Sequence, residues 1–95
     1  MKIDRLDHLV LTVQNIEATC EFYSRVLGMQ VVTFGNNRKA LQFGRQKINL
    51  HERGKEFDPK ALNPTPGSGD LCFITETRLS QVVKHIRSCS VEIIE

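Results

Sequence analysis

The sequence predicts an α+β fold built from tandem βαβββ modules, with the second module incomplete at its C-terminus. Two observations predict it: residues 6–52 read as strand, helix and three strands, and the residues from 70 onward begin the same order again. The chain has 95 residues, of which 40% are hydrophobic and 25% charged. A chain of this size fits one small domain and cannot bury two independent cores.

The first module opens with a strand and a helix. Apolar and polar residues alternate from Leu6 to Val13, the period of a β-strand. Asn15 is expected to cap a helix over residues 16–27, because its side chain can accept a bond from a free amide of the first turn. Gly28 is expected to end that helix in the left-handed conformation.

Three short strands should follow at residues 29–34, 38–43 and 47–52, separated by turn residues. In the last of these strands Ile48 and Leu50 face one side of the sheet, whereas Asn49 and His51 face the other. The first module is therefore expected to occupy residues 1–53.

Residues 54–69 contain all three prolines and lack periodicity, so they are expected to be a linker. A strand is expected at residues 70–75, followed by a helix capped by Thr77 and another strand at residues 91–94. Residues 70–95 would then be the start of a second module, truncated before its last strands.

The two modules align without a gap. Placing His8 over Asp70 gives a constant offset of 62 residues, and the expected caps Asn15 and Thr77 then coincide. His8 and Asp70 thus occupy equivalent positions on two first strands. Two potential metal ligands in matching places carry more weight than a single histidine.

Charge and cysteine content exclude several classes of protein. The net charge of +2 is too small for a typical nucleic-acid-binding surface, and no apolar run reaches the length of a membrane span. The three cysteines form no CxxC pair, which argues against a zinc ribbon and a disulfide framework and favours a cytoplasmic protein. Seven of the 13 Lys and Arg residues lie between positions 38 and 60. These residues form either an ordinary solvated surface or a basic surface that attracts an anionic substrate.

Several of these segments resemble the vicinal oxygen chelate superfamily, which contains glyoxalases, bleomycin resistance proteins and extradiol dioxygenases. The resemblance rests on the Asp7-His8 strand and on the helix end Phe22-Tyr23-Ser24-Arg25-Val26-Leu27-Gly28. Within the superfamily, residues 38–41, 47–52, 54–57 and 59–61 resemble glyoxalase domain-containing protein 5 and its bacterial relatives.

The resemblance implies a divalent metal, Zn, Ni, Mn or Fe, held on the concave side of each sheet. His8 matches the first metal ligand and Asp70 matches the ligand of the second module. Asn49 stands where glyoxalase I has a glutamate ligand, so it suits substrate binding better, and His51 two residues on is a further candidate ligand. No residue matches the catalytic base, whose identity stays unknown.

The function that this resemblance implies is a metal-dependent, glyoxalase-like enzyme acting on a small substrate with adjacent oxygens, as lactoylglutathione lyase does. Two alternatives stay open: a protein related to extradiol ring-cleavage dioxygenases, and a metal-free module that sequesters a small molecule. We also expect a homodimer, because open strand edges pair with a neighbour.

Overall fold

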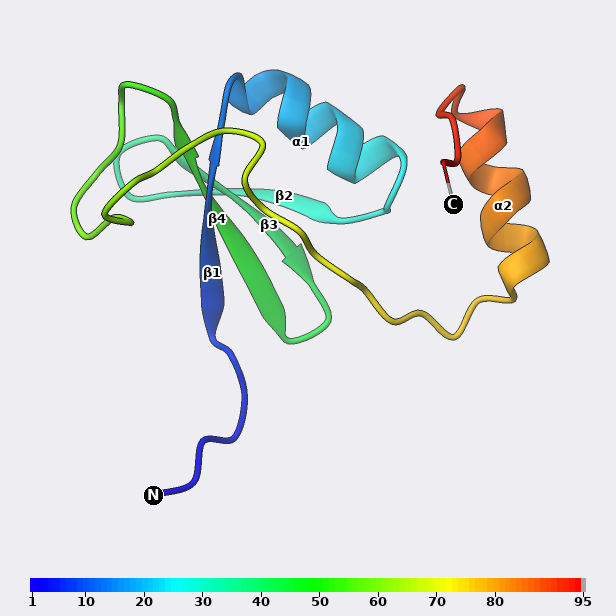
Figure 1. The fold of residues 1–95 in the computed structure, drawn as a ribbon, viewed down its shortest axis with the longest axis horizontal. Coiled ribbons are helices and arrows are strands. Elements are labelled where there is room, and N and C mark those ends of the chain that lie inside the picture. Colours follow the sequence, from blue (N-terminus) through cyan, green and yellow to red (C-terminus); the bar gives the residue numbers. More distant parts are fainter. Residues whose placement is uncertain (95) are drawn as a thin grey trace.

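The computed structural model describes residues 1–94 and confirms an α+β fold. The elements follow the order β1 (His8–Val13), α1 (Ile16–Arg25), β2 (Gln30–Phe34), β3 (Arg38–Phe43), β4 (Gln46–Glu52) and α2 (Leu79–Ser88). Figure 1 shows α1 lying across one side of the sheet, whereas α2 lies apart from it at the end of a long connecting segment. The strand, helix and three strands expected for the first module are therefore confirmed.

The four strands form one sheet with the order β1-β4-β3-β2. The pairing of β1 with β4 is parallel, and the other two pairings are antiparallel. This order makes β1 and β2 the outer strands, so each has one edge that no other described strand covers.

Helix α1 is fixed at its N-terminus by two side chains. The Ala18 amide donates to Asn15 Oδ1 at 2.8 Å, which confirms the predicted cap. The Ile16 amide donates to Glu52 Oε1 at 3.3 Å, a contact that ties the helix to β4. The helix ends at Arg25, two residues before the predicted end, and Gly28 takes the expected left-handed conformation with φ of +69°.

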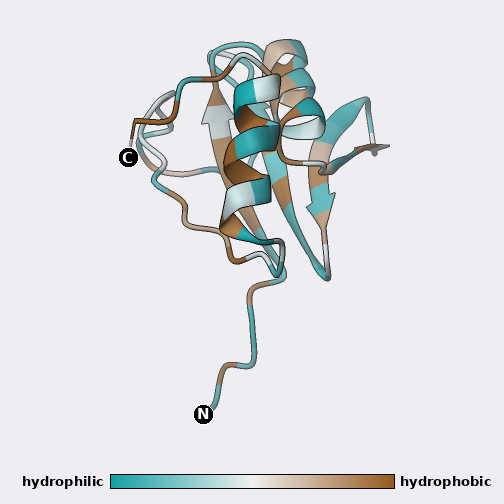
Figure 2. Ribbon diagram, turned by 90° about the vertical axis from the view of Figure 1, so that its right-hand side faces the viewer, coloured by the Kyte–Doolittle hydropathy of each residue, from teal (hydrophilic) through white to brown (hydrophobic). Residues whose placement is uncertain are grey.

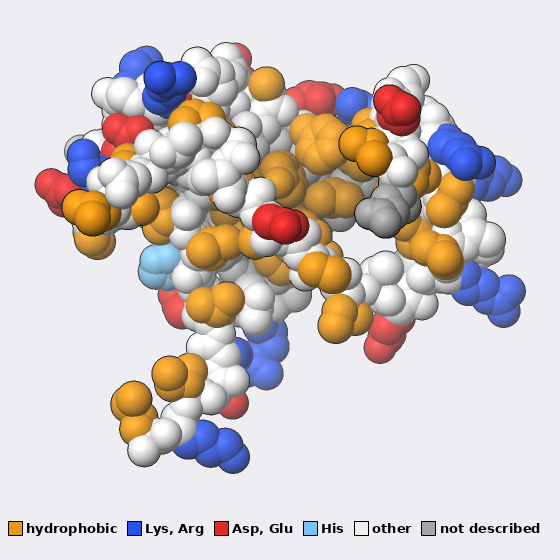
Figure 3. Space-filling view, in the orientation of Figure 1, with side chains coloured by type: hydrophobic (Ala, Val, Ile, Leu, Met, Phe, Trp, Pro, Cys, Tyr) orange, Lys and Arg blue, Asp and Glu red, His pale blue; other side chains and the backbone are white. Residues whose placement is uncertain are grey.

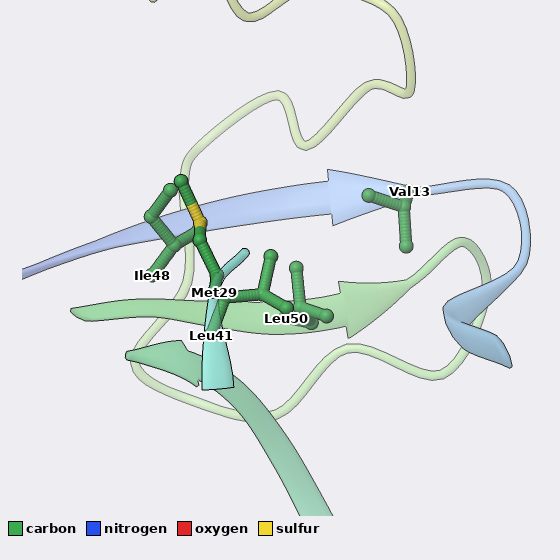
Figure 4. Close-up of a cluster of buried hydrophobic side chains, with 5 residues drawn as sticks. All are labelled: Val13, Met29, Leu41, Ile48 and Leu50. Carbon is green, nitrogen blue, oxygen red and sulfur yellow. The ribbon is translucent and has the colours of Figure 1, made fainter. Parts of the chain in front are cut away.

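The hydrophobic core lies between α1 and the sheet. Its buried members are the five residues labelled in Figure 4: Val13, Met29, Leu41, Ile48 and Leu50. Leu41 is fully buried, and Ile16, Cys20 and Tyr23 of α1 pack against the same cluster. Burial of this cluster stabilises the packing of α1 against the sheet. No helix within residues 1–94 covers the opposite side of the sheet.

The strands expected at residues 70–75 and 91–94 are wrong, because neither segment is paired as a strand in the structure. Most of residues 70–75 are exposed, Ile74 at 97%. A strand needs a neighbour for its backbone hydrogen bonds, and no described segment provides one here. The sequences of residues 70–75 and 91–94 therefore suit a β-sheet, but residues 1–94 offer them no strand to pair with.

The helix expected after residue 77 is present as α2, but Thr77 does not cap it. Arg78 is the N-cap, no side chain bonds to the first turn, and the Thr77 amide instead donates to Thr75 Oγ1 at 3.2 Å. Figure 2 shows hydrophobic residues along one side of α2. The C-terminal end of α2 meets α1 through the Arg25 Nη1 donation to the Cys89 carbonyl and the contact of His85 Nε2 with the Val26 carbonyl, both at 2.8 Å.

Neither helix within residues 1–94 combines the length and the hydrophobicity that crossing a membrane requires.

Candidate metal and substrate site

The side of the sheet opposite α1 carries the polar residues that the sequence singled out. In β1 the residues alternate, so that Leu11 and Val13 join the core and His8, Val10 and Thr12 point to the other side. Asn49 pairs with Val10 and His51 pairs with Thr12, which puts both on the same side as His8. We call this side the open face. The predicted shared face of Asn49 and His51 is therefore present, and the structure places His8 on it as well.

His8 is held by the residue that precedes it. Its Nδ1 lies 2.8 Å from Asp7 Oδ2, and this hydrogen bond to the imidazole lowers the pKa of the Asp7 carboxyl below its ordinary value. A charged carboxylate can only accept, so Nδ1 is the donor and Nε2 is left free to bind a ligand. The His8 side chain is 42% exposed, so Nε2 can be reached from solvent.

This Asp7–His8 pair has the arrangement found around metal-bound histidines, which usually donate their second ring N–H to a carboxylate or a carbonyl. Asp7 is a functional candidate that the sequence indicated only as part of a motif, without a role of its own. The order Asp7-His8 could have predicted this contact, because a carboxylate directly before a candidate histidine ligand is its nearest possible hydrogen-bond partner.

Asn49 lies near His8 on the open face. Asn49 is the strand partner of Val10, which lies two residues after His8 on β1. By ordinary strand geometry the Cα atoms of His8 and Asn49 are therefore about 8 Å apart. Its Oδ1 is buried and has no hydrogen-bond partner among the described residues. A buried amide oxygen without a partner is costly, which makes it suited to a ligand or substrate group that donates to it or binds it.

His51 lies at the other end of the open face. It is 7% exposed and packs at 5.9 Å, edge to face, against Phe57, over which the Arg38 guanidinium lies at 4.4 Å. Burial, and then the charge of Arg38, lower the pKa of the His51 imidazole below 6.5. Its Nδ1 is buried and has no hydrogen-bond partner in the described part of the chain.

The strand register separates His51 from His8. Because His8 pairs with Lys47 and His51 pairs with Thr12, the two histidines are four positions apart, about 13 Å along the strands. Two imidazoles that bind one ion must each bring a nitrogen to about 2 Å from it. The structure thus brings Asn49, and not His51, close to the His8 ring.

Asp70 does not approach His8 either. The segment around it packs on the α1 side of the sheet: a Cβ atom at Gly69 would lie 2.7 Å from Leu11 Cδ1, and the Phe73 ring is 5.5 Å from that of Phe43. Asp70 itself is exposed. Figure 3 shows hydrophobic side chains gathered between α1 and this segment, where residues of both line a groove of about 510 Å³.

The ligand set within the described residues is therefore partial. His8 Nε2 and Asn49 Oδ1 are suitable donors on one face, but residues 1–94 contain no group of three or more His, Cys, Asp or Glu side chains placed to hold a metal ion. Three ligands or more are usual for a catalytic metal. The described residues therefore offer at most two neighbouring groups, His8 and Asn49, that could bind a metal ion.

Two relatives match the whole chain. Virulence protein STM3117 of Salmonella typhimurium is 59% identical over 95 residues, which make up 66% of its length, and glyoxalase domain-containing protein RDO1 of Mycosarcoma maydis is 50% identical over 53% of its length. The chain thus spans just under two thirds of one relative and about half of the other. The expected closeness to glyoxalase domain-containing protein 5 stays a prediction.

The fold agrees with solved structures. The crystal structure of STM3117 superimposes with a TM-score of 0.97 over 100% of this chain and 75% of that one. A variant of the fosfomycin resistance protein FosX from Listeria monocytogenes, solved with Mn(II) and 1S,2S-dihydroxypropylphosphonic acid, gives a TM-score of 0.62 at 19% identity. It covers 96% of this chain and 68% of that one, and at this identity the likeness shows the fold alone.

A family model also matches residues 5–86, which include the whole sheet and the Asp7–His8 pair. With most of the chain matched and the fold in agreement, the chain belongs to the Glyoxalase/Bleomycin resistance protein/Dioxygenase superfamily.

Proposed function

We propose that this chain forms part of a metal-dependent, glyoxalase-like enzyme that acts on a small substrate with adjacent oxygens. The observation that carries the proposal is the hydrogen bond of His8 Nδ1 to the Asp7 carboxylate, which leaves Nε2 free on the open face. The metal could be Zn, Ni, Mn or Fe, since imidazole binds all four. Family membership and the Mn(II) bound to FosX support a divalent metal.

Each residue near His8 has a definite task in this proposal. His8 Nε2 binds the metal, and Asp7 holds the ring in the tautomer that allows this. Asn49 offers its unpartnered Oδ1 to a hydroxyl group of the substrate. When bound, the metal supplies Lewis-acid polarisation of the substrate oxygens. The residue that moves a proton is unassigned.

The remaining ligands come from outside this module. The segment around Asp70 packs on the α1 side of the sheet, so Asp70 would meet His8 only across two copies of the chain. We therefore propose a homodimer, which the open edges of β1 and β2 also favour. His51 remains a candidate metal ligand only if a second chain supplies another ligand near it on the open face.

The domain division is part of the same proposal. In it, residues 1–53 are the first module, residues 54–69 link it to the next, and the residues from 70 onward begin a second module, of which the described chain contains α2 and no strand. The three cysteines are free, which supports a cytoplasmic location.

A metal-free module that sequesters a small molecule is the second candidate. The observation in its favour is that the described residues supply fewer than three grouped ligands. Thermal-shift measurements separate the two functions, because metal ions should raise the melting temperature of an enzyme of the proposed type, whereas a sequestering module should respond to organic ligands alone.

Calorimetric titration of the 95-residue chain with Zn, Ni, Mn and Fe(II) tests the proposed function. We expect saturable binding of at least one metal, its loss in His8→Ala, and its retention in His51→Ala and in the control His85→Ala, which changes a histidine of α2 that contacts the Val26 carbonyl and does not lie on the open face. Absence of saturable binding, or equal binding by His8→Ala, contradicts the proposal.

A further inference from the structure

The open face contains a hollow of about 300 Å³ at the end where His8 lies. Its lining includes two cations, two amides, one aromatic ring and one carboxylate, contributed by Lys47, Arg45, Gln42, Gln46, Phe34 and Asp7. We call it the basic hollow. At the opposite end of the open face, His51 packs against Phe57, whereas the basic hollow has room for a small molecule.

The cations of the basic hollow are not neutralised by ion pairs. Within residues 1–94, no carboxylate lies within 4 Å of the Lys47 ammonium or of the Arg45 guanidinium. The Lys47 Nζ lies 5.1 Å from the centroid of the Phe34 ring. This cation–π contact holds the ammonium beside the Phe34 ring. The Asp7 carboxylate is engaged by His8 Nδ1. The Asp7 carboxylate also interacts electrostatically with Lys47, so two cations and one carboxylate leave the hollow with one positive charge in excess.

The register places this charge beside the proposed metal ligand. Lys47 is the strand partner of His8, so the two Cα atoms are about 4.8 Å apart and both side chains point to the open face. The side chain of Gln42, the strand partner of Lys47 on β3, adds neutral N–H donors to the same hollow. Cations and N–H donors around a small cavity are the groups that bind an anionic oxygen cluster.

We propose that the basic hollow binds the anionic group of the substrate, a carboxylate, phosphate or phosphonate, with Lys47 as its main partner and Arg45 at the rim. The metal part of this picture rests on the proposed function, but the anion subsite depends only on the charges and donors of the hollow. Together they define the substrate as a small anion whose adjacent oxygens lie next to the anionic group. Lys47 is thus a specificity-determining residue.

Titration of the metal-free 95-residue chain with methylphosphonate, followed by ¹H–¹⁵N NMR, tests this subsite. We expect saturable shifts of the Gln42 side-chain amide, and affinity at least tenfold weaker in Lys47→Gln. The charge-matched control Lys84→Gln removes a cation from exposed α2 and should leave the affinity unchanged. Propane-1,2-diol, which lacks the anionic group, should not produce these shifts.

The outcomes separate this inference from the proposed function. Unchanged affinity in Lys47→Gln, equal losses in Lys84→Gln, or shifts that do not saturate overturn the anion subsite. Lys47→Gln should still bind metal in calorimetry, and His8→Ala should still bind methylphosphonate without metal. A chain that binds the anion through Lys47 but binds no metal keeps the subsite and refutes the proposed function.

Discussion

At the scale of single residues, the chemistry of this chain centres on one imidazole and its partner. Asp7 accepts the Nδ1–H of His8, which orients the ring and leaves Nε2 free for a ligand. Asn49 adds a buried oxygen that lacks a partner, about 8 Å away. These contacts make the His8 end of the open face the place where metal and substrate would meet.

The contribution of Asp7 can be measured directly. We expect Asp7→Asn to lower metal affinity about 10- to 100-fold, because an amide accepts a weaker hydrogen bond and can hold His8 in the wrong tautomer. Calorimetric titration with Mn or Zn provides the measurement. Asp4→Asn, which removes the same charge from the exposed N-terminal segment, serves as the control. Equal affinity of Asp7→Asn and the wild-type chain would show that Asp7 does not position the ring.

His51 shows why a residue's type does not settle its role. Its ring is on the predicted face, yet Phe57 covers it and the register sets it about 13 Å from His8 along the strands. Burial lowers the pKa of the imidazole, so the ring is neutral at pH 7. A neutral, buried ring contributes to packing whether or not it also binds a ligand.

At the scale of elements, the sheet and α1 are joined by Glu52. Its carboxylate at the end of β4 accepts the Ile16 amide at the start of α1 and also pairs with Lys55 Nζ at 3.2 Å. The bond from the Ile16 amide, and then the one from Lys55, lower the pKa of the Glu52 carboxyl below 4.5. The contact fixes where α1 begins relative to the strand that carries Asn49.

This lowered pKa predicts an acid-dependent loss of stability. A carboxyl whose pKa falls on folding stabilises the native state above its unfolded pKa, and that contribution disappears as the pH falls through the folded pKa. We expect the melting temperature of the wild-type chain to fall between pH 6 and pH 3 more steeply than that of Glu52→Gln, measured by circular dichroism. Glu76→Gln, at an exposed position, should keep the wild-type steepness. Parallel profiles for all three chains would contradict the prediction.

At the scale of the whole molecule, stability is concentrated in residues 8–52. The core cluster lies between α1 and the sheet, whereas α2 has no buried residue and is linked to α1 by polar contacts at its C-terminal end. The exposed apolar side chains of residues 71–74 and of α2 suit an interface with additional strands or with a second copy.

The position of the core gives a prediction for the whole molecule. Leu41→Ala removes a fully buried side chain and should lower the free energy of unfolding by about 2–5 kcal/mol. Leu62→Ala changes a side chain that is 94% exposed and should stay within about 0.5 kcal/mol of the wild-type value. Urea denaturation measures both. Similar losses in the two variants would mean that the core does not lie where the structure places it.

Local sequence determined the first module because its signals act over a few residues. The alternation in β1, the Asn15 cap and the left-handed Gly28 each specify a conformation through neighbouring backbone groups, and the structure has all three. The same local reasoning put Asn49 and His51 on one side of their strand, because side chains in a strand alternate.

Tertiary structure decided what depends on partners distant in the sequence. The strands expected near residues 70 and 91 lack a neighbouring strand, so their pattern is not realised as a sheet in the described chain. The parallel register of β1 with β4 separated His8 from His51 and brought Lys47 and Asn49 to its side. Periodicity says which face a residue occupies, but only pairing across the sheet says how far along that face it lies.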